Sequence, residues 1–484
     1  MKLDTNRILD ITGGRLALAP ADAGRDLVGL TWDSRTAWQD CLYAALPGER
    51  VDGNDFIASA VEAGAMLVLA GREPDAAALE AARAHGAGIV EVEDVEAAIT
   101  ALAAAWRPML GATVIGITGS VGKTTVKSLT RQVLSSRFKT VATKGNFNNE
   151  LGAPYTVLSA DADCEMLVVE MGMDDLGQIA HICSFAKPDM GLVNNVGVSH
   201  LERLGSRENI ARAKAELFDA LEPGSFAFVN AADDMTPFLR SCGRLAEGVL
   251  NEADFSAAGE PAGEGCAVWA EGVSVDDEGR PSFTLCARGF DALGAEVERV
   301  SCSLGLRGVH NVSNACGAAG IGLACGIGLA GVARALGEAV PEAGRQEVKR
   351  AACGAVVFDD AYNASPASMK ASLSMLESYK ASGCKIAVLG DMGELGAASV
   401  EGHRETGRAA AEAGVGLLVC VGEAAADIAA GAYAAGMAEG RIVRVADAGA
   451  AVRALEGRID SSDVVLVKAS HFMRLDRVVE GIIA

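Results

Sequence analysis

The sequence lacks paired cysteines and an excess of positive charge. Its 12 cysteines are scattered singly, with no C-x-x-C pair and none at a zinc-ligand spacing from a histidine. We therefore expect small buried apolar thiols, not disulfides or metal ligands. Lys and Arg number 42 against 64 Asp and Glu, a net charge of −22. So acidic a chain disfavours nucleic acid or an anionic membrane as a partner, and an anionic ligand must be held by local cations and backbone amides.

Long runs of large apolar side chains are also absent. The first residues, MKLDTNR, contain no apolar segment, which predicts no signal peptide and a cytoplasmic protein. Residues 315–333 carry no charge and are long enough to cross a bilayer, but most of them are Gly or Ala. We expect a buried, closely packed helix there, and we reject the G-x-G-x-x-G at 326–331 as a nucleotide motif because it lies inside this run.

The most informative motif is a glycine-rich turn between an expected strand, residues 113–118, and an expected helix. Such a turn directs backbone N–H groups at phosphate oxygens, and the helix N-terminus adds a field that favours anions. Lys123 would contact the β- and γ-phosphates, and the Thr124 hydroxyl would bind Mg²⁺. Ile117 stands where the general P-loop has Gly, so the match is to a G-x-x-G-x-x-G-K-T variant. The predicted ATP-binding loop comprises Gly119, Ser120, Val121, Gly122, Lys123, Thr124 and Thr125.

The alternation of strands and helices divides the chain into three α/β domains. We predict a small α/β N-terminal domain over residues 1–109, a central P-loop ATPase-type domain over 110–340, and a C-terminal Rossmann-like, doubly wound domain over 341–484. The central sheet is expected to be mostly parallel, with an antiparallel appendage over 267–306. In the N-terminal domain residues 27–32 form one expected strand, and residues 95–105 form an expected helix.

Polar residues follow several expected strands of the central domain. Glu170 ends the strand 166–170, at the edge where a Mg²⁺ ligand of a P-loop domain belongs. His200 reaches the same edge, and its chemistry alone leaves a structural and a functional role equally open. Lys214 lies on an amphipathic helix, where a solvated lysine is the plain interpretation. Asn146, Asn148 and Asn149 suit either a turn or polar substrate recognition.

Taken in order, these segments resemble the Mur ligase family over nearly the whole chain, from Asp33-Ser-Arg35 and Asp52-Gly-Asn-Asp-Phe56 to Leu466-Val-Lys468. The family shares the P-loop variant with folylpolyglutamate synthase. More specific are three further motifs: Phe358-Asp-Asp-Ala-Tyr-Asn-Ala-Ser-Pro366, Leu389-Gly-Asp-Met-Gly-Glu-Leu-Gly396 with His403, and Gly308-Val-His-Asn-Val-Ser-Asn314. These are similar to the branch of the family that joins D-alanyl-D-alanine to UDP-N-acetylmuramoyl-tripeptide.

The resemblance implies an ATP-dependent carboxylate–amine ligase of peptidoglycan precursor synthesis that works through an acyl phosphate. Its substrates would be UDP-N-acetylmuramoyl-tripeptide, bound by the N-terminal domain, and D-alanyl-D-alanine, bound by the C-terminal one. We expect a monomer. Two Mg²⁺ ions are implied, one held by Thr124 and Glu170 and the other by His200, with a carbamylated Lys214 facing the metal.

The resemblance also implies roles for individual residues. The catalytic set is Lys123, Glu170, His200 and Lys214. Asn311 and Asn314 would lie near the adenine, and Arg345 and Asp360 would reach the nucleotide from the C-terminal domain. The expected UDP-substrate site comprises Ser34, Arg35, Asn54, Asn146, Asn148 and Asn149. The expected D-alanyl-D-alanine side comprises Tyr362, Asn363, Asp391, Glu394 and Lys468.

Two positions depart from the family pattern, and other functions stay open. The family usually has Lys-Gly-Ser-Arg where this chain has Lys468-Ala469-Ser-His471, which removes a permanent charge and a bidentate donor. Asn54 stands where His is common. The alternatives are a P-loop phosphotransferase or switch, and a ligase for an amino acid or for folate. The Asp-Ser-Arg segment argues against folate, while lysine and diaminopimelate remain equal as the third peptide residue.

The lysine of the glycine-rich loop gives the first test. Lys123→Ala removes a phosphate-binding cation and no core volume, so we expect phosphate release from ATP to fall at least about a hundredfold while the fold is kept. Phosphate release at saturating ATP and circular dichroism measure the two effects. Turnover close to that of the unchanged protein would contradict the assigned loop.

Overall fold

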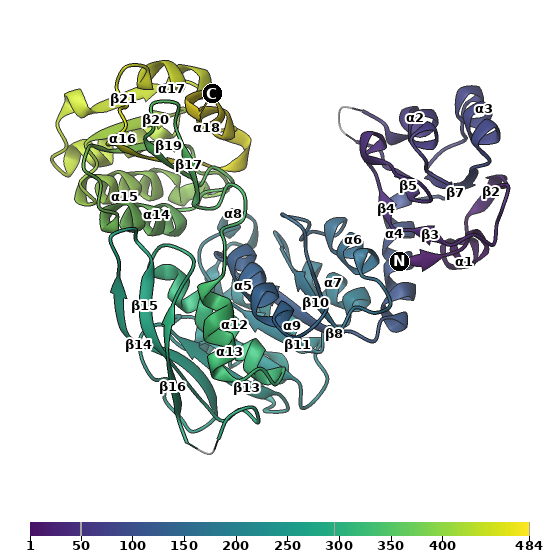
Figure 1. Ribbon diagram of the computed structural model, residues 1–484, viewed down its shortest axis with the longest axis horizontal. Coiled ribbons are helices and arrows are strands. Elements are labelled where there is room, and N and C mark those ends of the chain that lie inside the picture. The colour runs from purple at the N-terminus through teal and green to yellow at the C-terminus, as the bar shows by residue number, and fades with distance from the viewer. Residues whose placement is uncertain (49–50, 295, 484) are drawn as a thin grey trace.

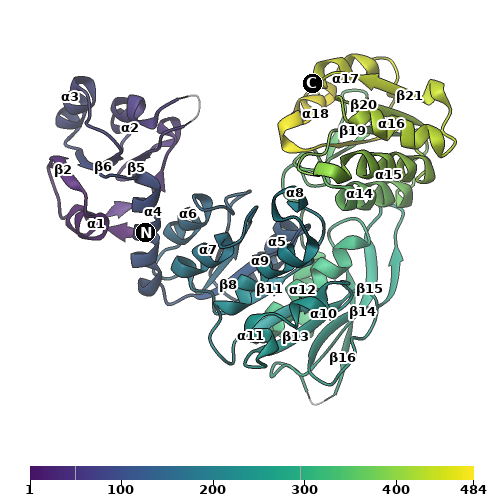
Figure 2. The ribbon, with the colours of Figure 1, turned by 180° about the vertical axis from the view of Figure 1, so that it is seen from behind.

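The computed structural model describes residues 1–48, 51–294 and 296–483 and contains three α/β units. Figure 1 shows them as an open V, with the central unit at its base and the N-terminal and C-terminal units at the two upper ends. The view from behind shows the same arrangement (Figure 2). The 12 cysteines are all free, as expected. Among the described residues, no helix is long and apolar enough to cross a membrane.

The N-terminal unit is built on a five-stranded sheet in the order β2-β7-β6-β5-β4. The strands of this sheet are β2 (Arg15–Leu18), β4 (Leu30–Thr31), β5 (Leu42–Ala45), β6 (Leu67–Ala70) and β7 (Gly88–Glu91). A separate antiparallel pair is formed by β1 (Lys2–Leu3) and β3 (Leu27–Val28). Its α-helices are α1 (Thr5–Thr12), α2 (Ile57–Glu62), α3 (Ala76–His85) and α4 (Val95–Trp106). The helix expected over 95–105 is confirmed. The single strand expected over 27–32 is wrong, because Gly29 has φ 79° and a Cβ there would lie 2.8 Å from the Trp38 ring.

The central unit is a nine-stranded sheet in the order β16-β15-β14-β13-β12-β11-β8-β10-β9. Its strands are β8 (Thr113–Thr118), β9 (Thr140–Ala142), β10 (Met166–Glu170), β11 (Met190–Val193), β12 (Phe226–Asn230), β13 (Asn251–Ser256), β14 (Cys266–Val275), β15 (Pro281–Arg288) and β16 (Glu298–Ser303). All pairs from β9 to β14 are parallel, and β15 and β16 are antiparallel. The antiparallel appendage is therefore confirmed, and it extends the main sheet.

Helices cover both faces of the central sheet. They are α5 (Lys123–Ser135), α6 (Gly152–Ser159), α7 (Gln178–Ala186), α8 (Leu201–Leu204), α9 (Arg207–Asp219), α10 (Thr236–Leu239), α11 (Gly243–Ala246), α12 (His310–Ala324) and α13 (Leu329–Gly337). Most of the uncharged segment 315–333 is buried, as expected, but its residues 326, 328 and 330 are exposed and it is not one helix. It breaks between α12 and α13, where Gly326 has φ 79°, so the G-x-G-x-x-G lies partly in a turn.

The C-terminal unit is a six-stranded sheet in the order β17-β18-β22-β19-β20-β21, parallel except for β17. Its strands are β17 (Glu347–Arg350), β18 (Val356–Asp359), β19 (Lys385–Gly390), β20 (Leu417–Val421), β21 (Ile442–Val445) and β22 (Val464–Lys468). Its helices are α14 (Pro366–Ser378), α15 (Ser399–Glu412), α16 (Ala425–Ala434), α17 (Ala448–Leu455) and α18 (Asp476–Ile483). One apolar cluster lies on each face of the sheet, as a doubly wound unit requires.

The N-terminal and central units share an apolar joint. A single core cluster runs from Leu42 in β5 through α4 to Val114 in β8. In the same joint the Trp106 Nε1 donates a 2.9 Å hydrogen bond to Ala160 O, and Trp32 packs against the Phe147 and Tyr155 rings, with centroids 5.3 and 5.0 Å away. The core clusters of the C-terminal sheet are separate from those of the central sheet, so that joint has no shared apolar core.

The Trp106 contact supplies a stability test. Trp106→Phe keeps a ring but removes the shorter of the two hydrogen bonds that Ala160 O accepts, the other coming from the Met1 ammonium at 3.3 Å, so we expect a loss of about 1 kcal/mol in the free energy of unfolding. The urea midpoint followed by circular dichroism measures it. The control is Trp38→Phe, because Trp38 also donates to a carbonyl, Val28 O at 2.8 Å, but its side chain is exposed. Equal losses in both variants would contradict the importance of the buried joint.

Candidate active site

The glycine-rich loop connects β8 to α5 as expected. Gly119 and Gly122 have φ 155° and 81°, and a Cβ on Gly122 would lie 2.7 Å from Asn194 Nδ2 and 2.8 Å from Asn314 Oδ1. Only glycine is compatible with this loop, since the positive φ is strained for other residues and the space is filled. The Lys123 Nζ donates to Gly119 O at 2.8 Å, so the lysine side chain lies along the loop.

Asparagines at the end of β11 hold the loop in place. Asn195 Oδ1 accepts a hydrogen bond from Val121 N at 2.9 Å, and Asn194 Nδ2 donates to Val121 O at 2.9 Å. Asn194 Nδ2 also donates to Asn314 Oδ1 at 2.9 Å, which ties the loop to α12. The sequence patterns do not predict this role, although Val-Asn-Asn at a strand end is a visible polar signal.

Glu170 is fully buried at the end of β10, beside the loop. Its Oε1 accepts hydrogen bonds from Thr124 Oγ1 at 3.1 Å and from Asn148 Nδ2 at 2.8 Å. Its buried Oε2 has no hydrogen-bond partner in the described part of the chain. An unpartnered carboxylate oxygen next to a hydroxyl suits Mg²⁺, which binds few protein oxygens and completes its shell with water and substrate phosphate. Within the described residues, no group of three or more His, Cys, Asp or Glu could hold a metal ion.

Lys214 lies on α9 with only 1% of its surface exposed, so the solvated lysine that the helical pattern suggests is wrong. Burial lowers the pKa of the Lys214 ammonium well below its usual range, and the charge of Lys123 lowers it further. No carboxylate among the described residues offsets these effects. A lower pKa eases loss of the proton, and the uncharged amine is the form of a lysine side chain that reacts with CO₂.

His200 faces the C-terminal unit. It has φ 64°, and its Nδ1 lies 2.9 Å from Glu394 Oε2, where Glu394 itself has φ 61°. Burial lowers the pKa of His200 more than the Glu394 carboxylate raises it, so the imidazole is neutral near pH 7. Two residues expected on different sides of the reaction thus meet at the joint of the central and C-terminal units.

A cavity of about 1000 Å³ brings most of the predicted side chains together. It is lined by Ser120, Val121, Gly122, Lys123, Thr124, Asn146, Asn148, Asn149, Glu170 and His200 of the central unit. From the C-terminal side it is lined by Arg345, Tyr362, Asn363, Glu394, Lys468 and His471. The carboxyl ends of strands from two sheets therefore open into one space, the usual ligand edge of such sheets.

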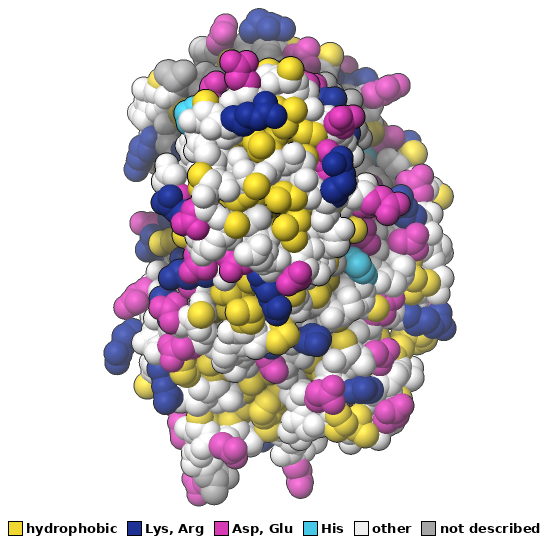
Figure 3. Space-filling model, turned by 90° about the vertical axis from the view of Figure 1, so that its right-hand side faces the viewer, with side chains coloured by type: hydrophobic (Ala, Val, Ile, Leu, Met, Phe, Trp, Pro, Cys, Tyr) yellow, Lys and Arg dark blue, Asp and Glu magenta, His cyan; other side chains and the backbone are white. Residues whose placement is uncertain are grey.

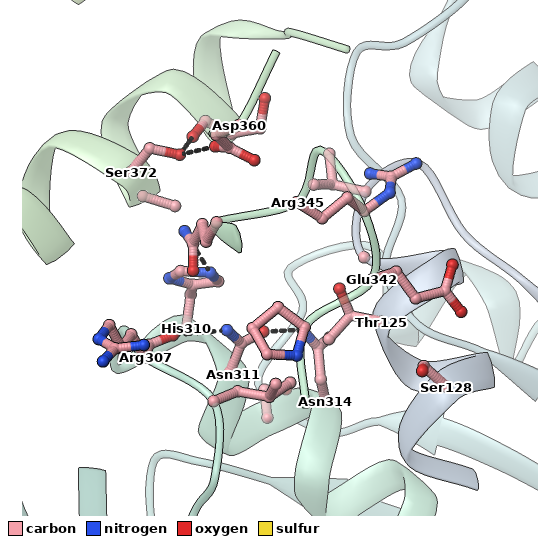
Figure 4. A pocket seen from close by; sticks show the side chains of 18 of the residues that line it. Thr125, Ser128, Arg307, His310, Asn311, Asn314, Glu342, Arg345, Asp360 and Ser372 are labelled. Carbon is pink, nitrogen blue, oxygen red and sulfur yellow. Dashed lines mark hydrogen bonds between the residues drawn. The ribbon is translucent and has the colours of Figure 1, made fainter. Parts of the chain in front are cut away.

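A second cavity of about 360 Å³ adjoins the loop and is lined in part by Val121 and Gly122 (Figure 4). Asn311 and Asn314 of α12 lie at one wall, and the Asn314 Nδ2 donates to Asn311 Oδ1 at 2.8 Å. Thr125 of α5 lies near them, and Asp360 projects from the opposite, C-terminal wall (Figure 4). A polar, amide-lined cavity adjoining a phosphate loop can hold the base of a nucleotide.

Two cations, Arg345 and Lys468, line both cavities, and the rings of Tyr362 and His471 line the larger one. The buried Lys468 Nζ pairs with Asp360 Oδ2 at 2.8 Å and donates to Asn363 O at 2.9 Å. The guanidinium of Arg345 lies over the Tyr362 ring, 4.3 Å from its centroid. The His471 ring lies 5.6 Å from the same centroid. Where the family usually has a second cation, this chain therefore places an imidazole against Tyr362.

Six predicted residues line neither cavity. Two of them are Gly119, in the loop between β8 and α5, and Lys214, on α9. Ser34 and Arg35 belong to the N-terminal unit, where the exposed Arg35 pairs with Asp33. Asn54 is buried and bonds within its own region, since its Oδ1 accepts from Gly71 N at 3.2 Å and its Nδ2 donates to Asp52 Oδ1 at 2.7 Å. The carboxylate of Asp391 accepts from the backbone of the loop after β20, including Ala425 N at 2.7 Å. Asn54 and Asp391 therefore support loops.

The N-terminal unit presents a mixed surface on the side seen in Figure 3. Lysine and arginine side chains alternate there with acidic and hydrophobic ones, without one large patch of a single charge. The net charge of −22 is thus not concentrated on this face. An anionic ligand of this unit would need to be held by individual cations and backbone amides.

Known protein families match the chain from the N-terminal sheet to the end of β22. The Mur ligase family catalytic domain matches residues 26–107, the Mur ligase middle domain matches 117–322, and the Mur ligase, glutamate ligase domain, matches 344–471. The UDP-N-acetylmuramoyl-tripeptide–D-alanyl-D-alanine ligase of Mycobacterium tuberculosis (strain H37Rv) is 39% identical and covers 100% of this chain and 98% of that protein.

Two solved structures resemble the whole arrangement. MurF from Acinetobacter baumannii has a TM-score of 0.81 at 28% identity, covering 100% of this chain and 99% of that one. MurF from Thermotoga maritima in complex with ADP has a TM-score of 0.74 at 27% identity, covering 94% and 97%.

The burial of Lys214 yields a prediction about covalent chemistry. We expect ¹³C-labelled bicarbonate to produce a carbamate signal in the ¹³C spectrum that Lys214→Ala removes. Lys468→Met should keep the signal, because Lys468 is equally buried but paired with Asp360. Lys214→Ala should also lose most phosphate release from ATP, at least about tenfold, and regain part of it with formate or acetate. A fully active Lys214→Ala variant would contradict the carbamate.

Proposed function

The chain belongs to the Mur ligase family, and we propose that it forms the amide bond between UDP-N-acetylmuramoyl-tripeptide and D-alanyl-D-alanine. It is an ATP-dependent, peptide-forming ligase of peptidoglycan synthesis. The observation that carries this function is the full-length likeness to relatives of that activity, together with a cavity in which a phosphate loop faces the polar strand ends of a second sheet.

The reaction has two steps of balanced chemistry. An oxygen of the tripeptide's terminal carboxylate attacks the γ-phosphorus of ATP, so that ADP leaves and an acyl phosphate forms. The amine nitrogen of D-alanyl-D-alanine then attacks the carbonyl carbon, loses a proton, and expels inorganic phosphate. In such a transfer the protein chiefly positions the reactants and stabilises the charge on the moving phosphoryl group.

The loop residues serve the nucleotide. Lys123 and the backbone N–H groups of Gly119 to Thr125 would hold the phosphates, while the Asn311–Asn314 pair would border the adenine in the smaller cavity. Arg345 and Asp360 would reach the nucleotide from the C-terminal side. The ADP complex of the Thermotoga relative supports a nucleotide at this kind of site.

Thr124 and Glu170 would hold one Mg²⁺, and His200 with a carbamylated Lys214 would hold a second. When bound, such ions neutralise the phosphoryl oxygens and polarise the reacting carboxylate. The unpartnered Glu170 Oε2, the lowered pKa of His200 and the lowered pKa of the buried Lys214 support this assignment.

The remaining residues divide between the two other substrates. Asn146, Asn148 and Asn149 would orient the tripeptide end, with Ser34 and Arg35 on the UDP side. The dipeptide would be bound by Tyr362, Asn363, Glu394 and Lys468. Asn54 and Asp391 would each support the loop that their side chains bond to. The domain boundaries at residues 109 and 340, a monomeric state and a cytoplasmic location stay predictions.

Coupling between the substrates tests the function. Phosphate release from ATP should be slow with either substrate alone. Both substrates together should raise the steady rate at least about tenfold, because attack by the amine is the step that releases phosphate from the acyl phosphate. A malachite-green assay with each substrate pair, using the lysine- and the diaminopimelate-containing tripeptide, measures the effect. Hydrolysis that ignores both substrates would favour a nucleotide switch.

A further inference from the structure

We propose that the buried Lys127 and the partly exposed Glu342 form an ion pair that fixes Arg345 relative to the nucleotide loop, which makes Lys127 a positioning residue of the ligase. The inference rests on the proposed function, because it gives Arg345 a role at the transferred phosphoryl group. Neither partner belongs to the motifs that identify the site. Both come from the geometry of α5 and the linker between the central and C-terminal units.

Lys127 is a cation enclosed by oxygen atoms. It lies one helical turn after Lys123 on α5, with 1% of its side chain exposed. Its Nζ lies 2.8 Å from Glu342 Oε1 and donates to Thr143 O at 2.9 Å and to Gly145 O at 3.4 Å. The unpartnered Glu170 Oε2 lies 3.9 Å away. A buried charge so surrounded is costly to leave without its partner.

Glu342 belongs to the linker that precedes β17. The Arg345 N donates to Glu342 O at 3.0 Å, which closes a tight turn between the two residues. Figure 4 shows the Glu342 side chain extending toward α5, while Arg345 lies at the same side of the cavity. An anchor on Glu342 is therefore transmitted to Arg345 through one hydrogen-bonded turn of backbone.

Arg345 lies where the position of this turn affects both cavities. It lines both cavities and lies over the Tyr362 ring, which belongs to the loop after β18. The chain of contacts thus runs from the nucleotide helix through Lys127 and Glu342 to Arg345, and from there to the C-terminal sheet. Because the two sheets share no apolar core among the described residues, an ion pair anchored on the buried Lys127 is a strong determinant of where this guanidinium lies.

The ion pair also affects the charges around Glu170, because Lys127 lies near both the Glu170 and the Glu342 carboxylates. Among the described residues, Lys127 is the cation nearest to the unpartnered Glu170 Oε2, and the same ammonium is paired more closely with Glu342. Removing Glu342 would let Lys127 pair more closely with Glu170, whereas removing Lys127 would leave two carboxylates without their cation. Opposite effects on metal binding are therefore expected from the two single variants, although both release the linker.

The experiment uses the full-length protein with Glu342→Gln, Lys127→Met and the double variant. Amide hydrogen exchange of a peptide covering residues 340–346 is measured with and without ADP, alongside kcat and KM for ATP and the Mg²⁺ dependence. Lys139→Met is the control, because its ion pair with Asp163 is exposed on the same unit. Glu342→Gln changes no shape at a partly exposed position, which keeps the test valid should Lys127→Met fold poorly.

We expect each single variant to speed linker exchange and to lower kcat at least about tenfold, with KM for ATP changed less than about threefold. The double variant should be no worse than the poorer single one, because the two residues act through one contact. Glu342→Gln should raise the Mg²⁺ concentration needed for half-maximal rate, and Lys139→Met should change nothing.

Unchanged linker exchange and unchanged kcat in Glu342→Gln would overturn the inference, as would additive losses in the double variant. A role limited to stability would lower the melting temperature of Glu342→Gln without altering linker exchange, and this too would overturn it. A wrong proposed function would give a different result. The unchanged protein would then show no substrate-coupled phosphate release. Amide exchange of the linker needs no substrate, so it would still test the ion pair.

Discussion

An acidic protein that handles anionic substrates must concentrate its cations where those anions react. Here that concentration is achieved by burial. Lys123 and Lys468 line the larger cavity, and Lys127 lies beside the carboxylates of Glu170 and Glu342. Lys127 and Lys468 are almost completely enclosed, as is Lys214 on α9. Each is controlled differently: Lys127 and Lys468 by carboxylate partners, Lys214 by the absence of one among the described residues. Desolvation strengthens every charge contact at this edge, so the arrangement of lysine partners determines what the site can bind.

The two joints of the molecule are physically different. The N-terminal and central units share one apolar core, whereas the central and C-terminal units meet through charged and polar contacts such as His200–Glu394 and Lys127–Glu342. An apolar joint is insensitive to salt and tolerates small rearrangements poorly, while a polar joint responds to the charges of whatever lies in it. The cavity that contains the phosphate loop opens at the polar joint.

The sequence predicts the elements that depend on local pattern. The strand–glycine loop–helix unit, the strand-end position of Glu170 and the three sheets follow from glycine spacing and apolar periodicity. Contacts between distant segments do not. Nothing near Lys127 in the chain indicates Glu342, and the Asn194–Asn314 pair joins strands and helices far apart in sequence. The burial of Lys214 and the support role of Asp391 are likewise decided by tertiary packing, which overrides the local amphipathic pattern.

The placement of the tryptophans has a consequence for spectroscopy. All four, at positions 32, 38, 106 and 269, precede the C-terminal sheet, and Trp32 lies against Tyr155 at the apolar joint. Tryptophan emission from this protein therefore reports the surroundings of the N-terminal and central units. The C-terminal unit has no tryptophan and contributes nothing to that emission. If the C-terminal sheet unfolds in a separate transition, tryptophan fluorescence alone would not detect that transition. Agreement between fluorescence and circular dichroism is thus the measure of whether the three sheets unfold together.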